Sequence, residues 1–597
     1  MNMLQNAPYR ALALFLLLAW SGGSPAVAAS KRESWVEVRS PHFVAYSDAG
    51  EAEARRTLEG FEGIRSVFTA ALPGLVVDLH KPVIVIVTEN EASMRRFVPD
   101  QFAGKDPKRS SGLYMRGRER DLAIVRLDVG RQEDQPFAVV FHEYTHAIVH
   151  NNFASLPTWL DEGVAEFYGS TEIRSKRVYL GRIPFHHLGT LRRGRMPLKA
   201  VLQVSHDSPE YMEGSKANQF YAQSWAMVHY LFLDEAARKA GTLGAYLRAL
   251  SAQSDPLAAA QQGFGDLAAF EGRIAQYVSR PSLAFLDLAL QVSLSDKDFK
   301  VRPVGEAEAL ALRAEVLAQA RKEEDAGLLL DQAKALDPRA PQVQVALGLA
   351  SLRKGDWAGA ERALRAAREA GSTDFRAPLH LAELALQSLP ATAPSEAILG
   401  WLEEARRLEP DFPGIQLALC RLHAREPRNP EKAAEAGKEA IRLAPSDVAL
   451  RLNVGSVLLA LGREEEAKAL GDQAARMAVE AWERQAVASY QGQVARFLAQ
   501  REALAMAAAS QSGPALDPPP SMPMATPPGA SRGKPLKFWL PDTLADLRRE
   551  VHVAVLEGRL DDAIRMVKEA IPKAKGPYEK PSLKALLEHL KARKAGA

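Results

Sequence analysis

Alternating apolar and polar positions before residue 130 predict a layer of strands and helices. Residues 35–38 and 43–47 alternate like half-buried strands, whereas residues 82–88 are apolar throughout, which indicates a strand covered on both faces. Residues 51–72 place apolar side chains at helical spacing and predict one amphipathic helix. Two short runs, 112–115 and 122–127, predict a β-hairpin that closes through a polar turn.

From about residue 305 the pattern changes to alanine-rich amphipathic helices interrupted by turn signals. The signals recur about every 34 to 38 residues, near Asp337, Gly371, Glu409 and Ala444. This period resembles tetratricopeptide repeats and implies an all-α solenoid over residues 305–505. Stacked helix pairs of that kind present a concave surface to a peptide or protein partner. A helical array that only braces the first part of the chain is the alternative.

The end of the chain differs from both parts. Residues 512–535 are rich in proline and polar residues, which predicts an extended linker. Residues 536–597 return to a helical pattern with one more repeat-like turn. We therefore expect a separate C-terminal helical segment after the linker.

The strongest chemical signal is His142-Glu-Tyr-Thr-His146, followed by the acidic segment Trp159-Leu-Asp-Glu-Gly-Val-Ala-Glu-Phe167. Residues four apart on a helix lie on one face, so the two imidazoles can share a metal ion. Glu143 is rotated to the side, where its carboxylate can act as a general base on water at an open metal position. This spacing is typical of zinc hydrolases.

A catalytic zinc site of this kind needs a third protein ligand. His150 continues the series but lies about 12 Å along a helix axis from His142, too far to share one ion. The acidic segment predicts a second helix, in which Asp161 and Glu162 are both early enough to reach the ion. We favour Glu162 and expect Glu166 to accept a hydrogen bond from a ligand histidine ring. The alternative is a surface helix with solvated carboxylates.

These motifs resemble gluzincin metallopeptidases, specifically the peptidase MA-like, DUF1570-like group. The match is strong over residues 137–170 and weaker over 35–295. It implies an α+β fold in which a gluzincin-like metallopeptidase domain occupies residues 31–296, ahead of the all-α repeat solenoid. In gluzincins an edge strand runs along the active-site cleft and binds the substrate backbone, a role that the hairpin at 112–127 would take unless it is only a scaffold.

The resemblance also implies the roles of individual residues. One Zn²⁺ per chain would be held by His142, His146 and Glu162, because in this group the Glu of an Asn/Asp-Glu-Gly-x-Ala segment is the third ligand. Glu143 would be the catalytic base.

A segment around Tyr221 resembles the helix start where zinc aminopeptidases place a tyrosine that donates to the tetrahedral oxyanion. The resemblance implies Tyr221 in that role, with Tyr211 and His229 as reserves. A half-buried ring with a capped hydroxyl is an equally weighted alternative. The neighbouring pair His186 and His187 lacks metal-ligand spacing and is interpreted as structural or as part of the site's rim.

Composition and charge limit the cellular compartment of the protein and the classes of partner that it can bind. The chain has 597 residues and a formal net charge of +3. It contains no basic run with interleaved aromatic residues, so the sequence does not indicate nucleic-acid binding. Residues 1–29 combine Arg10, a short apolar run and small residues, which predicts a cleaved signal peptide and a periplasmic or secreted protein; an uncleaved anchor is the alternative. We expect no other membrane span. The single cysteine, Cys420, allows no intrachain disulfide and is predicted to lie in a core.

Two functions follow from these features. The first is an exported zinc metallopeptidase, more plausibly an endopeptidase, that hydrolyses a peptide or protein substrate and recruits partners through its repeats. The second is a protein-binding scaffold that keeps the metallopeptidase fold with weak or no catalysis. Glu143 discriminates between them, because a scaffold has no need for a base that is not a metal ligand.

Overall fold

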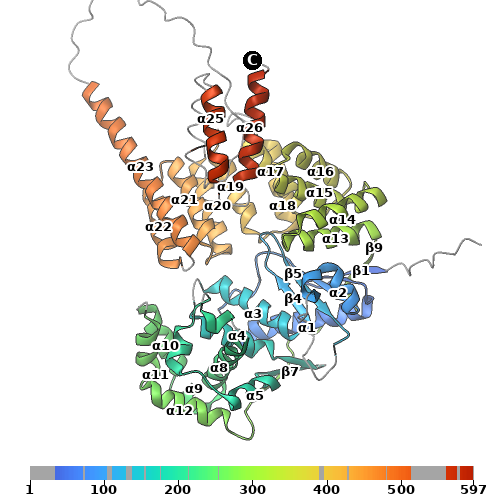
Figure 1. Cartoon of the computed structure of the whole chain (residues 1–597), viewed down its shortest axis with the longest axis vertical. Coiled ribbons are helices and arrows are strands. Elements are labelled where there is room, and N and C mark those ends of the chain that lie inside the picture. Colours follow the sequence, from blue (N-terminus) through green and yellow to red (C-terminus); the bar gives the residue numbers. More distant parts are fainter. Residues whose placement is uncertain are drawn as a thin grey trace, which may run out of the picture.

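A mixed sheet with strand order β4-β5-β3-β2-β1-β9 organises the first part of the described chain (Figure 1). This computed structural model describes residues 34–595 except 72–73, 104–110, 130–136, 154–155, 175, 207, 213, 253–254, 389–394, 426–428, 479–480, 512–546, 548–550, 552–559 and 575–578. The predicted signal peptide and proline-rich linker lie outside the described residues. The strands of this sheet are β1 (Trp35–Arg39), β2 (Val44–Ser47), β3 (Val83–Thr88), β4 (Gly112–Met115), β5 (Asp121–Arg126) and β9 (Lys300–Val304).

The strands, helix and hairpin predicted before residue 130 are confirmed, each to within one residue. The central strand β3 is buried along its whole length because helices cover both faces of the sheet. Its valines belong to the core with α1 (Glu51–Ala71) and α3 (Ala138–Asn152). Its isoleucines belong to the core with α2 (Glu91–Phe97) and α13 (Glu306–Gln319). Two covered faces explain why this strand shows no apolar–polar alternation.

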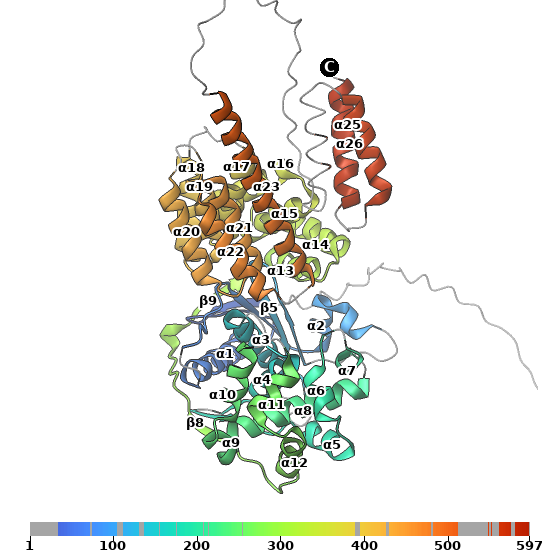
Figure 2. The ribbon, with the colours of Figure 1, turned by 90° about the vertical axis from the view of Figure 1, so that its left-hand side faces the viewer.

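A helical layer lies on the side of α3 away from the repeats (Figure 2). Helix α4 (Thr158–Gly169) packs between α3 and α8 (Gly214–Leu233). The remaining elements before the repeats are η1 (Pro99–Phe102), β6 (Glu172–Arg174), β7 (Arg177–Leu180), α5 (Phe185–Arg193), α6 (Leu198–Gln203), α7 (Pro209–Met212), α9 (Glu235–Lys239), α10 (Thr242–Ala252), α11 (Pro256–Phe264), α12 (Leu267–Val278), β8 (Leu286–Ala289) and η2 (Asp296–Asp298). Strands β6, β7 and β8 form a second, smaller sheet.

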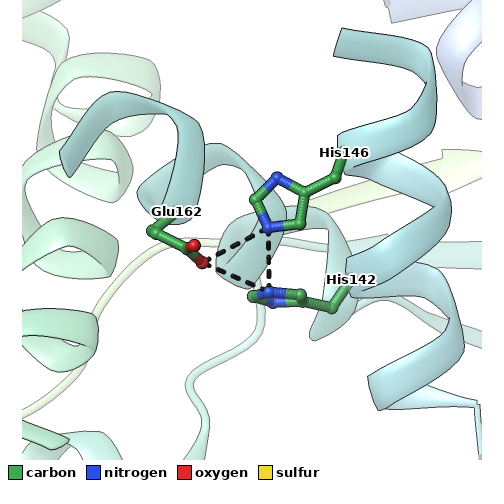
Figure 3. A group of neighbouring side chains, drawn as sticks. All are labelled: His142, His146 and Glu162. Carbon is green, nitrogen blue, oxygen red and sulfur yellow. Dashed lines mark hydrogen bonds and ion pairs between the residues drawn. The ribbon is translucent and has the colours of Figure 1, made fainter. Parts of the chain in front are cut away.

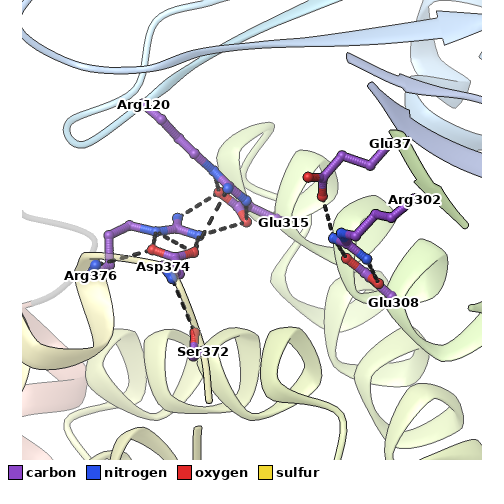
Figure 4. Close-up of polar contacts among 8 residues, drawn as sticks. All are labelled: Glu37, Arg120, Arg302, Glu308, Glu315, Ser372, Asp374 and Arg376. Carbon is purple, nitrogen blue, oxygen red and sulfur yellow. Dashed lines mark hydrogen bonds and ion pairs between the residues drawn. The ribbon is translucent and has the colours of Figure 1, made fainter. Parts of the chain in front are cut away.

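The predicted boundary between a first domain that ends at residue 296 and repeats that begin at residue 305 does not coincide with a break in the structure. Strand β9 pairs with β1 in an antiparallel ladder that joins Val304 to Trp35, so this segment completes the sheet. Leu312 and Val316 of α13 then pack in the same core as Trp35. Lys300 and Arg302 lie on this edge strand, where Arg302 pairs with Glu37 and Glu308 (Figure 4). The first helix predicted for the repeats therefore also belongs to the core of the first domain.

The second part of the chain is a stack of antiparallel helix pairs. Within the described residues, the first helices of five pairs begin at residues 306, 341, 376, 413 and 448, which is the period predicted from the turn signals. The helices after α13 are α14 (Glu323–Leu336), α15 (Pro341–Lys354), α16 (Trp357–Glu369), α17 (Arg376–Ser388), α18 (Glu396–Leu408), α19 (Pro413–His423), α20 (Pro430–Leu443), α21 (Val448–Ala460), α22 (Glu464–Met477) and α23 (Ala481–Gln511). Cys420 is fully buried in the core of α17 to α20, as predicted.

The described part of the C-terminal segment is a helical hairpin. It consists of α25 (Leu560–Ala570), η4 (Ile571–Lys573) and α26 (Glu579–Ala595), which share a small apolar core. Across all the residues that the structure describes, no helix combines the length and apolar character that a membrane crossing requires.

Candidate metal centre

Two histidines of α3 and a glutamate of α4 face one another (Figure 3). His142 and His146 lie one turn apart on the same face of α3, as the spacing predicts. His142 Nε2 lies 3.1 Å from His146 Nε2, and Glu162 Oε2 lies 3.3 Å from each of these nitrogens. The three atoms therefore form a nearly equilateral triangle.

The triangle has the size that a zinc ion requires. Bonds of about 2.0–2.1 Å in a tetrahedron place neighbouring ligand atoms about 3.3 Å apart. Two imidazoles and one carboxylate are also a donor set found in catalytic zinc sites, where a fourth position stays open. The residues present thus form a possible metal-binding group, and their chemistry fits Zn²⁺.

Charge favours a cation between these side chains. Burial acts to raise the pKa of Glu162, but its hydrogen bonds with His142 and His146 lower it to about 2. Burial acts to lower the pKa of His146, but Asp161 and Glu162 raise it to about 10. Glu162 is therefore ionised, and in the metal-free chain it lies beside a His146 ring that holds a second proton. A metal ion would replace that proton.

Asp161 orients His146. Its Oδ1 lies 3.0 Å from His146 Nδ1, and its Oδ2 lies 2.8 Å from His150 Nε2. A carboxylate accepts hydrogen bonds, so the Nδ1 of His146 donates to Asp161, and its Nε2 faces the triangle, where it would bind an ion after losing its proton. Asp161 thus contacts His146 from the side opposite the candidate ion, while Glu162 faces it.

His142 has a matching support. Its Nδ1 lies 3.6 Å from Glu166 Oε1, and Glu166 Oε2 lies 2.9 Å from His187 Nε2. Glu166 therefore faces a ring nitrogen of a candidate ligand, as expected, but the distance is too long for the predicted hydrogen bond. His187 is buried and holds the far side of Glu166, a role that its sequence position does not reveal.

Gly163 sets the depth at which α4 lies. A Cβ atom at this position would lie 2.4 Å from the carbonyl oxygen of Ser224 and 2.6 Å from the side chain of Val228 on α8. Only glycine permits this approach, and it brings Glu162 towards the two histidines of α3. The Glu-Gly pair of the motif therefore joins a candidate ligand to the packing contact that places it.

Tyr211 and Tyr221 complete the wall of the centre. The Tyr211 hydroxyl donates to Glu162 Oε1 at 2.8 Å, and Tyr221 is hydrogen-bonded to Tyr211. Burial raises the pKa of both phenols, and the charge of Glu162 raises it further, so both stay protonated. Tyr221, the predicted oxyanion donor, lies in this group, but Tyr211 makes the direct contact with a candidate ligand.

The prediction of His229 as an alternative oxyanion donor is wrong. It is completely buried, with Nδ1 2.8 Å from the Tyr277 hydroxyl and Nε2 2.8 Å from the carbonyl oxygen of Gly181. Both ring nitrogens are therefore used within the core. Burial lowers its pKa to about 4, which keeps the ring neutral.

Glu143 lies on α3 beside the triangle. It is half-buried, and it has no hydrogen bond or ion pair with any other described residue. Its charge contributes to the raised pKa of Tyr221, which places the carboxylate on the tyrosine side of the centre. An ionisable group that has no partner among the described residues is suited to exchange a proton with a bound molecule.

Sequence reasoning missed the residues that hold the ligands in place. Asp161 was considered only as a ligand, and His150 only as a ligand that is too distant. A third residue, Arg116, comes from the β4–β5 turn, and its guanidinium lies 2.8 Å from His150 Nδ1. The spacing of His146 and His150 on one helix face was the available signal for His150, whereas nothing local marks Arg116.

We compared the chain with curated proteins, with solved structures and with models of protein families. No curated protein matches the chain. Among solved structures, pilF of Pseudomonas aeruginosa aligns with 19% identity over 32% of this chain and 91% of that one, with a TM-score of 0.26. A thermophilic TPR protein of Thermus thermophilus aligns with 20% identity over 31% and 98%, with a TM-score of 0.26.

A third structure, a tetratricopeptide repeat protein from Parabacteroides merdae, aligns with 14% identity over 48% of this chain and 100% of that one, with a TM-score of 0.27. Residues 136–258, which include α3, α4 and α8, match the model of a family described as "Protein of unknown function (DUF1570)".

Proposed function

We propose that the chain is an exported zinc-dependent hydrolase of peptide bonds, with a gluzincin-like first domain that extends past residue 296 to include β9 and α13. The observation that carries this proposal is the triangle of His142 Nε2, His146 Nε2 and Glu162 Oε2, with distances of 3.1, 3.3 and 3.3 Å. Glu143 supports it, because this carboxylate lies on the same helix and has no hydrogen bond or ion pair among the residues that the structure describes. Export follows from the signal-like residues 1–29.

Zinc, when bound, would supply a Lewis acid that polarises the scissile carbonyl and lowers the pKa of water towards about 7. Glu143 would accept the proton of the attacking water and return it to the leaving amine. Tyr221 or Tyr211 would donate to the oxygen that gains negative charge. Asp161 and Glu166 would keep the two imidazoles directed at the ion.

The helix pairs from α13 onward would bind a protein or peptide partner. Stacked pairs of this kind bury one face and present the other, which suits an extended chain. The second candidate function, a scaffold without catalysis, is favoured by one observation: the array is continuous with the core of the first domain through β9 and α13. A scaffold would need this rigid connection but not Glu143.

Replacing Glu143 with glutamine separates the two functions. The amide has the same shape but cannot accept the proton, so hydrolysis of an unstructured peptide mixture should fall by roughly 100-fold or more while zinc content stays unchanged. Glu235→Gln, on the exposed helix α9, is the matched control and should retain full activity. Equal hydrolysis by the wild type and Glu143→Gln would contradict the proposed mechanism. A wild type that binds zinc but cleaves nothing would support the scaffold.

A further inference from the structure

The turn between β4 and β5 lies against the repeat array. Gln319 of α13 donates from Nε2 to the carbonyl oxygen of Met115 at 3.0 Å. Glu119 in the turn lies 3.0 Å from His380 Nε2 on α17, and Arg120 pairs with Glu315 of α13 (Figure 4). The array therefore contacts the turn at its beginning and at its end.

The contacts around Arg120 form a charged network. Arg376, at the start of α17, lies 2.7 Å from Glu315 Oε1 and 2.6 Å from Asp374 Oδ2. Two arginines and two carboxylates thus alternate in space, so each charge has a partner of opposite sign. Such a network fixes directions better than an isolated surface pair does.

The turn is stiff between these contacts. Gly117 donates from its backbone nitrogen to Asp121 Oδ1 at 2.9 Å, and its carbonyl oxygen accepts from Lys81 Nζ at 2.9 Å. A Cβ atom on Gly117 would lie 2.1 Å from the carbonyl oxygen of Arg120, so the turn closes tightly on itself. A shift at one end of such a turn must move the other end.

Polar contacts hold the β4–β5 turn against the repeat helices. A cavity of about 620 Å³ is lined jointly by the turn, by α13 and by the helices α15 to α17. Its lining includes the apolar side chains Leu349 and Leu352 as well as the charged groups of the turn. The contacts that hold the turn against the array are thus the hydrogen bond of Gln319 and the ion pairs of Glu119 and Arg120.

On its other side the turn reaches the candidate metal centre. Arg116 can only donate, so His150 Nδ1 accepts its hydrogen bond at 2.8 Å and Nε2 of the same ring carries the hydrogen. His150 Nε2 then donates to Asp161 at 2.8 Å, and the other oxygen of Asp161 accepts from His146 Nδ1 at 3.0 Å. Arg116 thus fixes which nitrogen of His150 carries the hydrogen, and Asp161 accepts hydrogen bonds from both His150 and His146.

We infer that the repeat array positions the metal ligand His146 through this continuous chain, which runs from Gln319 by way of Arg116, His150 and Asp161. We call it the repeat-to-metal relay. Gln319 holds the peptide group directly before Arg116, and Arg116 orients the ring that orients Asp161. The residues of the relay are positioning residues, since none of them lies in the ligand triangle. The inference rests on the proposed zinc site.

The test is the zinc affinity of the full-length chain, measured by competition with a chromophoric chelator. Gln319→Ala should weaken zinc binding by roughly fivefold or more, within the usual range for coupled sites. Gln344→Ala is the matched control, because that amide also donates to a backbone carbonyl, of Pro338, but within the array. Its zinc affinity should equal that of the wild type.

Two substitutions at Arg116 test the middle of the relay. Arg116→Met removes the donor and should weaken zinc binding about tenfold, whereas Arg116→Lys keeps a donor and should restore most of the affinity. The visible absorption of bound Co²⁺ should change in Arg116→Met and in Gln319→Ala, because the geometry of His146 changes. The combined variant should lose less than the two single losses multiplied, since both interrupt one chain.

The outcomes separate this inference from the proposed function. If Gln319→Ala and Arg116→Met bind zinc as the wild type does, while His142→Ala does not bind it, the relay is refuted and the zinc site stands. A wild type that binds no zinc would overturn the site and the relay together. Should Gln319→Ala fail to fold, the methionine and lysine variants of Arg116 decide the question on their own.

Discussion

Single residues of the candidate centre have two kinds of role, to face the ion or to hold a residue that does. Glu162 and Asp161 are neighbours in sequence and illustrate both. Glu162 directs a carboxylate oxygen into the triangle, while Asp161 lies behind His146 and contacts its other ring nitrogen. The peptide between them changes the direction of the side chain by about 100° around the helix, so adjacent acids serve different purposes.

Gly163 carries a testable consequence of this packing. Gly163→Ala would place a methyl group 2.4 Å from the Ser224 carbonyl oxygen, so α4 must move away from α8. We expect a loss of about 1–3 kcal/mol in the free energy of unfolding and weaker zinc binding, because Glu162 moves with the helix. Urea unfolding and zinc titration measure the two effects. Gly272→Ala on α12 is the control, since no atom lies within 4 Å of its Cβ position. A fully stable Gly163→Ala chain would contradict the account.

The β4–β5 turn contacts the repeats in addition to β9 and α13, and we expect its contact with α17 to depend on pH. Burial acts to lower the pKa of His380, but Glu119 and Glu383 raise it to about 10. Burial acts to raise the pKa of Glu119, but His380, Arg376 and Arg118 lower it to about 2.

The two pKa shifts determine how the stability of the contact between His380 and Glu119 changes with pH. The contribution of His380 is complete below its unfolded pKa of about 6.5 and is lost as the pH rises through about 10. That of Glu119 is complete above about 4.3 and is lost as the pH falls towards 2. We predict that the contact is strongest between about pH 4.3 and 6.5.

Thermal unfolding of the wild type and of His380→Gln checks this prediction. The difference in Tm between the two chains should be largest near pH 6 and should shrink by pH 10. A difference that stays constant from pH 6 to pH 10 would show that His380 is neutral in the folded chain.

Elements with a local pattern could be predicted from the sequence, and contacts between distant polar residues could not. The apolar run of β3 and the spacing of His142 and His146 each define an element and its buried face, because neighbouring residues supply the signal. Arg116 and His150 meet only after the hairpin and α3 have folded together. Strand β9 was missed because its alternation is interrupted by charged residues and Pro303, which an edge strand tolerates.

For the whole molecule, the continuous core predicts where the chain can be divided. A chain that ends at residue 300 lacks most of β9 and all of α13, and it exposes the sheet face formed by Ile84, Ile86 and Ile124. We expect it to aggregate, because a large apolar face would lie open to water. A chain that ends at residue 338 keeps α13 and α14 and should be more soluble. Size-exclusion chromatography of the two chains measures the difference. Equal solubility would mean that α13 is dispensable for the first domain.

The central claim is that His142, His146 and Glu162 hold one zinc ion, and the most direct measurement is the zinc content of the purified full-length chain and three variants. The account predicts about one zinc per chain for the wild type and almost none for His142→Ala or Glu162→Ala. Asp161→Asn should still bind zinc, with affinity about 10- to 100-fold weaker. Full zinc content in Glu162→Ala, together with its loss in Asp161→Asn, would show that the third ligand is Asp161 and would contradict the account.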